Sequence, residues 1–301
     1  MRRYGAGATE HQVLDFVDGY WWSNDGLRLH YRDYAAGSDA VAGRPPIICF
    51  PGLTRNVRDF ETVAKRLAAG WRVIVVEFRG RGDSGYAQDA MTYVPLTYVQ
   101  DVERLLTDLK IDRFVAIGTS LGGIVTLLLA ATRRERIAAA VLNDVGPVIE
   151  PAGLDRIRSY VGKGGAFPTW IHAARSIAEL NTTVFPDYEL VDWLTMAKRT
   201  YRLSANGRIV PDYDKKIAEP FRLPGGEAGI DLWPAVDALA DTPTLIVRGA
   251  LSDLLSSETA ERMKGRLQKA STVTVPGIGH APVLDEPEAI GAIDALLAEV
   301  A

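Results

Sequence analysis

RFVAIGTSLGGIVTLLLAA, residues Arg113 to Ala131, is the segment from which the architecture of this chain can be worked out. Its apolar, partly β-branched beginning predicts a buried strand, and the apolar positions that follow Gly122 predict a helix. Ser120 is therefore expected in a sharp turn between a strand and a helix. Such a turn lifts the hydroxyl clear of the sheet, and it leaves no room for a β-carbon at Gly118 or Gly122.

The position of Ser120 suits a nucleophile. A serine hydroxyl attacks a carbonyl only with help from a base, and the turn brings its oxygen to where a base can reach it. The helix that begins after Ser120 also places the N–H of Leu121 where it can donate to a developing oxyanion. The pattern G-x-S-x-G alone is common, but the strand before it and the helix after it favour a nucleophilic serine.

The composition is that of an ordinary globular protein, large enough for one domain with an inserted smaller one. The chain has 301 residues, of which 34 are basic and 38 acidic, so its formal net charge is −4. This balance gives no long-range attraction for nucleic acid or an anionic membrane, and we expect neither as a partner. Cys49 is the only cysteine, which excludes an intrachain disulfide. Without an apolar run of signal or membrane-spanning length, we expect a cytoplasmic protein.

Strands and helices are expected to alternate along most of the chain. An aromatic-rich hairpin over Asp18–Tyr34, turning at Asn24-Asp25-Gly26, opens the pattern. Because parallel strands cannot be joined by tight turns, the order predicts an α/β fold, a mostly parallel sheet of about eight strands with helices on both faces. Buried strands are expected at residues 47–50, 72–78, 114–117, 137–143, 243–248 and 271–275, and helices at 56–69, 95–110, 256–268 and 287–300 in addition to the one after the serine.

The alternation stops after residue 146 and resumes near residue 236. Residues 147–235 read as helical segments and loops without a buried strand, so we expect a helical cap inserted after the sixth strand, between core segments 1–146 and 236–301. Its aromatic residues are candidates for the wall of a substrate pocket, although aromatics at helical spacing more often pack in a core. The pocket candidates are Trp170, Trp193, Phe167, Phe185 and Met196, together with His172.

A base for Ser120 has to come from four histidines. His11 lies in a tail-like start, His30 alternates within a hairpin strand as a surface or packing residue, and His172 belongs to the insertion. His280 follows the last predicted strand, in a glycine-containing loop at its carboxyl end. Ser120 ends its own strand, and the carboxyl ends of parallel strands share one edge, where α/β proteins bind ligands. His280 is therefore the predicted base.

The histidine needs an acid to hold its tautomer, and two aspartates qualify. Asp253 follows the strand at residues 243–248, at the same edge of the sheet, and is the first candidate. Asp144 is the rival, because it follows the strand directly after that of the serine. A second backbone donor for the oxyanion is expected from Leu53, in the tight turn that Gly52 allows after the first buried strand.

These residues resemble the α/β-hydrolase superfamily, and the resemblance covers nearly the whole chain. The shared pattern is G-T-S-L-G at residues 118–122, an aspartate after a later strand and Gly279-His280 after the last, in the order Ser, Asp, His. The loop R-G-x-G-x-S at Arg79–Ser84 and the helical insertion are also similar to that family. The resemblance assigns three catalytic roles and two oxyanion donors: nucleophile Ser120, base His280, orienting acid Asp253, donors Leu53 and Leu121.

A serine with a base and an oxyanion hole forms an acyl-enzyme that water releases, which suits carboxylic esters. The resemblance implies two further reactions with the same side chains, hydrolysis of carbon–carbon bonds in ring-cleavage products and opening of lactones or enol lactones. Ser120 argues against the dehalogenases and epoxide hydrolases of similar fold, which use an aspartate at this turn. A ligand receptor on a hydrolase scaffold is the non-enzymatic alternative. We expect a small ester-like substrate and neither a cofactor nor a metal, and the sequence predicts no oligomeric state.

Overall fold

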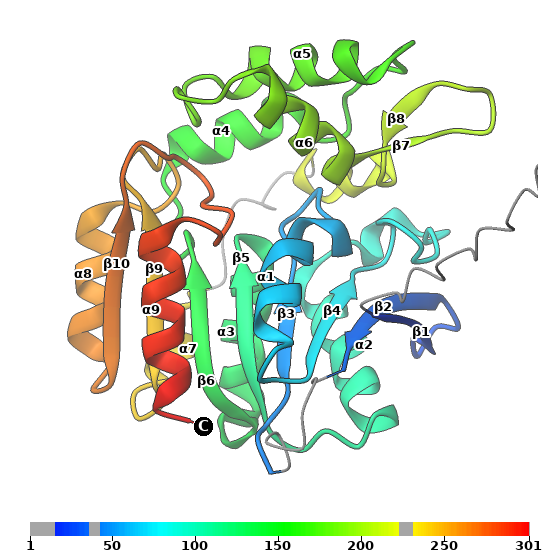
Figure 1. Cartoon of the computed structure of the whole chain (residues 1–301). Coiled ribbons are helices and arrows are strands. Elements are labelled where there is room, and N and C mark those ends of the chain that lie inside the picture. Colours follow the sequence, from blue (N-terminus) through cyan, green and yellow to red (C-terminus); the bar gives the residue numbers. More distant parts are fainter. Residues whose placement is uncertain (1–15, 36–42, 223–230, 301) are drawn as a thin grey trace, which may run out of the picture.

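Eight strands form one sheet, in the order β1-β2-β4-β3-β5-β6-β9-β10 (Figure 1). The structure, a computed structural model, describes residues 16–35, 43–222 and 231–300. The strands of the sheet are β1 (Val17–Trp22), β2 (Arg28–Tyr34), β3 (Ile47–Phe50), β4 (Val73–Glu77), β5 (Phe114–Thr119), β6 (Ile137–Asn143), β9 (Thr244–Gly249) and β10 (Ala270–Val275). Strand β5 runs through the middle of the sheet and brings Ser120 to its carboxyl edge.

The antiparallel hairpin and the parallel strands meet at β2. This strand pairs antiparallel with β1 on one side and with β4 on the other, where His30 lies opposite Glu77. The remaining neighbours, from β4 across to β10, pair in parallel. The predicted hairpin and the mostly parallel sheet are therefore confirmed, and the carboxyl ends of β5, β6, β9 and β10 lie along one edge.

Helices cover both faces of the sheet, as predicted. They are α1 (Glu61–Leu67), α2 (Pro95–Asp108), α3 (Leu121–Arg133), α7 (Trp233–Asp237), α8 (Ser257–Arg266) and α9 (Pro287–Ala298). Buried side chains of α2, α3, α7 and α8 share one hydrophobic cluster, whereas those of α1 and α9 belong to a second cluster on the opposite face (Figure 1). Residues of β5 alternate between them, since Phe114 packs in the first cluster and Val115 in the second. In the described part of the chain, no helix combines the length and apolarity needed to cross a membrane.

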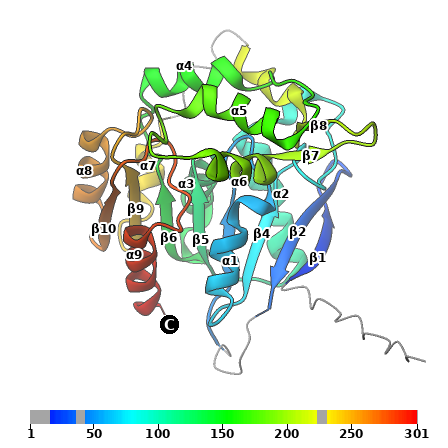
Figure 2. The same ribbon diagram turned by 45° about the horizontal axis from the view of Figure 1, so that its top comes forward.

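The segment after β6 lies over the carboxyl ends of the strands (Figure 2). It contains α4 (Pro151–Tyr160), α5 (Trp170–Asn181), α6 (Leu190–Thr200), β7 (Tyr201–Leu203) and β8 (Ile209–Pro211). Helices α5 and α6 pack on each other around a hydrophobic cluster of their own. The antiparallel pair β7–β8 was not expected from the sequence, because strands of three residues are too short for an alternating pattern to show. Helix α7 packs against α3 and α8, so the chain rejoins the core a few residues before the expected boundary at residue 235.

Candidate active site

Ser120 occupies the sharp turn between β5 and α3. Its backbone has φ 53° and ψ −116°, a combination that residues other than glycine rarely adopt. Close packing on both sides holds this strain, because a β-carbon on Gly118 would overlap the carbonyl of Gly122, and one on Gly122 would overlap the carbonyl of Phe50. The predicted crowding at both glycines is confirmed.

The hydroxyl of Ser120 lies against the imidazole of His280. The distance from Ser120 Oγ to His280 Nε2 is 2.9 Å, and on the other side of the ring Nδ1 lies 2.8 Å from Oδ2 of Asp144. A carboxylate only accepts hydrogen bonds, so Nδ1 carries the proton and Nε2 presents its lone pair to the serine hydroxyl. The structure therefore brings Ser120 and His280 together, as the sequence predicted.

Asp144 is fully buried at the end of β6, and hydrogen bonds reach both of its carboxylate oxygens. Oδ1 accepts from the N–H of Gly249 at 2.8 Å, and Oδ2 accepts from Ser252 Oγ at 2.6 Å as well as from His280. A buried carboxylate would be costly without such donors. The last residue of β9 and the loop after it supply two of them and thereby fix the carboxylate that faces the histidine.

This arrangement corrects the first candidate for the orienting acid, Asp253. That residue follows β9, but its carboxylate forms a bidentate pair with Arg156 of α4, at 2.5 Å from Nε and 2.8 Å from Nη2. Burial raises the pKa of Asp253, but the hydrogen bond and the charge of Arg156 outweigh this effect and leave the pKa lowered. The expected pairing of Asp253 with His280 is wrong, and Asp144, the rival candidate, occupies that place.

The two expected oxyanion donors lie on either side of the serine turn. Leu121 is the first residue of α3, so its N–H has no partner within the helix. Leu53 lies in the turn after β3, which is close to the serine, because a β-carbon on Gly52 would come 3.7 Å from Cβ of Ser120. Over the described residues, neither N–H donates a hydrogen bond to a backbone carbonyl. The oxyanion role of both groups stays a prediction.

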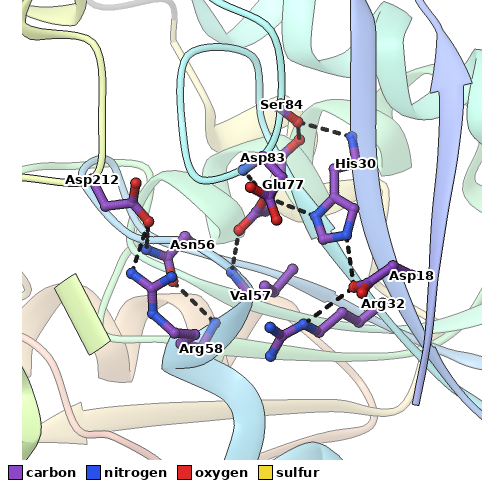
Figure 3. A network of polar contacts seen from close by, with 10 residues as sticks. All are labelled: Asp18, His30, Arg32, Asn56, Val57, Arg58, Glu77, Asp83, Ser84 and Asp212. Carbon is purple, nitrogen blue, oxygen red and sulfur yellow. Dashed lines mark hydrogen bonds and ion pairs between the residues drawn. The ribbon is translucent and has the colours of Figure 1, made fainter. Parts of the chain in front are cut away.

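The turn that carries Leu53 is anchored to the core and to the segment that lies over the carboxyl ends of the strands. Arg81, which is fully buried, donates from Nε to the carbonyl of Leu53 at 2.9 Å. In the residues that follow this turn, Asn56 Nδ2 and Arg58 Nη2 both donate to Oδ2 of Asp212, at 3.1 and 2.7 Å (Figure 3). Asp212 directly follows β8, so this network ties the turn beside Ser120 to the segment that covers it.

The same network contains a buried histidine (Figure 3). Glu77 accepts from the N–H of Val57 through Oε1, at 3.1 Å, and its Oε2 lies 2.8 Å from His30 Nδ1. The other ring nitrogen of His30 lies 2.9 Å from Oδ1 of Asp18. Burial lowers the pKa of His30, but its hydrogen bonds to the two carboxylates outweigh burial and raise the pKa. His30 is therefore a buried packing residue with both nitrogens paired, whereas His11 lies outside the described residues.

A cavity of about 50 Å³ opens at Ser120 and His280. Two larger cavities share wall residues with it: one of about 310 Å³ shares Tyr160 and Asn181, and one of about 260 Å³ shares Val283. The wall of the Ser120 cavity contains several polar side chains that were not predicted from the sequence. Isolated polar residues form no recognisable motif, so nothing in the sequence indicates them. They are Arg55, Asp59, Arg156, Tyr160 and Asn181.

Three of the residues expected to line a pocket, Trp170, Trp193 and His172, are not in the walls of these three cavities. Trp193 is buried in the cap's own cluster, and Trp170 is half-buried against the same cluster. His172 is exposed, with Nδ1 2.8 Å from the hydroxyl of Thr169 at the start of α5. The two tryptophans pack in the cluster between α5 and α6 rather than on these cavities, and the part of these three residues in substrate binding stays a prediction. Met196, another of the candidates, lines both larger cavities.

Comparisons with known proteins agree with this architecture. The family model "Alpha/beta hydrolase family" matches residues 47–293. The chain is 33% identical over 283 residues to 3-hydroxybutyrate-oligomer hydrolase of Cupriavidus necator, covering 87% of this chain and 91% of that protein. It is 26% identical over 256 residues to 2-(acetamidomethylene)succinate hydrolase of Mesorhizobium japonicum, covering 84% and 85%.

A solved structure extends the likeness over almost the whole chain. The crystal structure of an α/β hydrolase from Novosphingobium aromaticivorans superposes with a TM-score of 0.90 at 56% identity, covering 95% of this chain and 99% of that one. The similarities agree with the order of strands and helices along the chain, with the sheet topology and with the serine turn. The chain belongs to the α/β-hydrolase family and is an enzyme of that family.

Proposed function

We propose that this enzyme hydrolyses carboxylic esters through an acyl-enzyme formed on Ser120. The observation that carries the proposal is the continuous hydrogen-bonded row from Ser120 Oγ through His280 to Asp144, with distances of 2.9 and 2.8 Å. Each member has the chemistry that its place requires: a hydroxyl that can attack a carbonyl, an imidazole nitrogen that can take its proton, and a buried carboxylate that fixes the tautomer of the imidazole.

In the first half of the reaction, His280 Nε2 takes the proton of Ser120 as Oγ attacks the ester carbonyl carbon. Asp144 stabilises the imidazolium that forms, and the N–H groups of Leu53 and Leu121 donate to the oxyanion. The C–O bond to the alcohol then breaks, and the alcohol leaves with the proton from His280. The product of this half is an ester of the substrate acyl group with Ser120.

In the second half, a water molecule attacks the acyl carbon while His280 takes one of its protons. The bond to Ser120 Oγ breaks, the serine regains its proton from the histidine, and the carboxylic acid is released. The cavity of about 50 Å³ at Ser120 suits a short acyl group, and the adjoining cavities offer room for the remainder of a substrate.

The named relatives support an ester as the bond that is cleaved. The 33% identical protein is named for the hydrolysis of 3-hydroxybutyrate oligomers, which are chains of hydroxyacids joined by esters. We propose short oligoesters of this type as the substrate class. Cleavage of carbon–carbon bonds and opening of lactones use the same three side chains and are the alternatives to be tested. The connected row of side chains supports catalysis over a receptor role, and the cytoplasmic location stays a prediction from the sequence.

The test is hydrolysis of a p-nitrophenyl ester series, acetate to octanoate, and of the 3-hydroxybutyrate dimer, by the wild type and Ser120→Ala. We expect turnover by the wild type, with a preference for the shorter acyl groups because of the small cavity, and none by the variant. Equal rates of hydrolysis by the wild type and Ser120→Ala would refute the assignment of Ser120 as the nucleophile. A folded wild type that opens lactones or cleaves vinylogous diketones but leaves all esters intact would replace the ester proposal by its alternative.

A further inference from the structure

We infer that Arg55 forms a binding site for a free carboxylate of the substrate, and that the enzyme therefore selects anionic esters. The inference rests on the proposed ester hydrolysis and narrows its substrate class. The esters in question carry a carboxylate a few bonds from the cleaved bond, as hydroxyacid oligomers and monoesters of dicarboxylic acids do.

Arg55 lies at the junction of the three cavities. It lines the cavity at Ser120 and both of the larger ones. Its position is set by the turn after β3, because its N–H donates to the carbonyl of Gly52 at 3.1 Å, and Gly52 itself packs close to the serine. A ligand that extends from Ser120 into either larger cavity therefore lies against walls to which Arg55 contributes.

The guanidinium of Arg55 makes no hydrogen bond within the described part of the chain, only a loose ion pair. Its nearest acid is Asp59, with 3.6 Å between Nη1 and Oδ1, which is too long for a hydrogen bond. The other arginine of the Ser120 cavity, Arg156, is by contrast occupied by its bidentate pair with Asp253. A guanidinium presents a planar fork of donors that matches a carboxylate, so Arg55 is equipped to hold one at this place.

Tyr160 adds a second donor beside Arg55. It lines the Ser120 cavity and the cavity of about 310 Å³, and its hydroxyl makes no hydrogen bond within the described residues. Burial raises the pKa of Tyr160, and the positive charge of Arg55 opposes that rise, so the hydroxyl stays a neutral donor close to the guanidinium. Both residues line the same cavities, and an O–H donor next to an N–H fork suits an acceptor-only group such as a carboxylate.

Asp59 is the group that competes with an anionic ligand. It lines the Ser120 cavity and faces Arg55 from one turn further along the chain. A substrate carboxylate that makes two hydrogen bonds to the guanidinium gains more than the loose pair at 3.6 Å provides. Replacing Asp59 by Asn should therefore strengthen the binding of anionic esters, whereas replacing Arg55 should weaken it.

The experiment compares esters that differ only in charge. The pairs are 3-acetoxybutanoate with 3-acetoxybutanamide, and ethyl hemisuccinate with ethyl succinamate, so that the carboxylate lies on the alcohol side in one pair and on the acyl side in the other. Each compound contains one ester bond, and the amide preserves its shape. Initial rates of acid release are measured for the wild type, Arg55→Gln, Arg55→Lys, Asp59→Asn and Arg113→Gln. Arg113 is an exposed residue at the opposite end of β5 and serves as the matched control.

We expect the wild type to prefer the carboxylate of at least one pair by about tenfold in kcat/KM, through a lower KM, and the preference to shrink at high ionic strength. In Arg55→Gln the preference should disappear, with Arg55→Lys between the two, while Asp59→Asn increases it and Arg113→Gln leaves both rates as in the wild type. The inference is overturned if the wild type hydrolyses carboxylate and amide equally well in both pairs. It is equally overturned if Arg55→Gln lowers both members of a pair by the same factor. A folded wild type that hydrolyses none of the four esters would instead refute the proposed ester hydrolysis itself.

Discussion

Replacing Asp144 by Asn should remove most of the activity, and replacing Asp253 by Asn should not. In the structure, Oδ2 of Asp144 lies 2.8 Å from His280 Nδ1 inside the protein, whereas Asp253 is paired with Arg156. An asparagine at position 144 can point its amide N–H₂ at the ring. Nδ1 then becomes the acceptor, the proton moves to Nε2, and the base no longer offers a lone pair to Ser120.

The size of this loss can be worked out from the charge that Asp144 supplies. A carboxylate and an imidazolium at contact distance attract each other by about 4 kcal/mol at the effective dielectric constant of a protein site. At about 1.4 kcal/mol for each factor of ten in rate, this attraction corresponds to roughly a thousandfold, and the wrong tautomer extends the loss toward ten-thousandfold. Asp253 is 30% exposed and compensated by Arg156, so we expect less than about a tenfold loss for Asp253→Asn.

The assay is kcat for p-nitrophenyl acetate at saturating substrate, with circular dichroism melting curves to show that both variants are folded. Asp253→Asn removes the carboxylate that pairs with Arg156, whereas Asp144→Asn leaves this ion pair in place, so the melting curve is the essential control for Asp253→Asn. A larger loss of kcat in folded Asp253→Asn than in folded Asp144→Asn would refute the assignment of the acid.

Two further predictions concern the stability of the fold. Gly122→Ala should lower the free energy of unfolding by about 3 kcal/mol or more, because its β-carbon overlaps the carbonyl of Phe50, whereas Gly291→Ala in α9 meets no atom and should stabilise by up to about 1 kcal/mol. Equal urea midpoints for the two variants would contradict this. The pKa of His30 is raised in the folded protein, so protonated His30 stabilises the fold. This stabilisation is fully present below pH 6.5 and is lost as pH rises through the pKa of the folded state. The urea midpoint of the wild type should therefore fall as pH rises above 6.5, and that of His30→Gln should fall less. If the two plots of midpoint against pH ran parallel, they would contradict a protonated His30 beside Glu77.

The sheet and the serine turn follow from the sequence because their signals are local. The buried residues of β5 stand next to one another in the chain, and the two glycines that the turn requires lie within five residues of sequence around Ser120. The position of His280 follows as well, since a parallel sheet brings the carboxyl ends of its strands to one edge. These features depend on periodicity and topology, which a sequence displays directly.

The orienting acid depends on contacts that no local pattern displays. Asp144 and Asp253 follow neighbouring strands, β6 and β9, so topology alone places both near His280. Two contacts decide which aspartate faces His280. Ser252, 108 residues away in the sequence, donates a hydrogen bond to Asp144, and Arg156 of α4 pairs with Asp253. The polar side chains of the cavity wall could not be predicted for a similar reason, because they are single residues that come from the segment after β3, from α4 and from α5.

The central claim is that Ser120 is the nucleophile and that the row through His280 to Asp144 activates it. The most direct measurement is labelling with a fluorophosphonate, followed by peptide mass spectrometry, in the wild type, Ser120→Ala, Asp144→Asn and Asp253→Asn. We expect one label per chain, on the peptide containing Ser120, with no label in Ser120→Ala, slow labelling in Asp144→Asn and nearly normal labelling in Asp253→Asn. A label on another residue, or labelling of Ser120→Ala at the wild-type rate, would contradict the account.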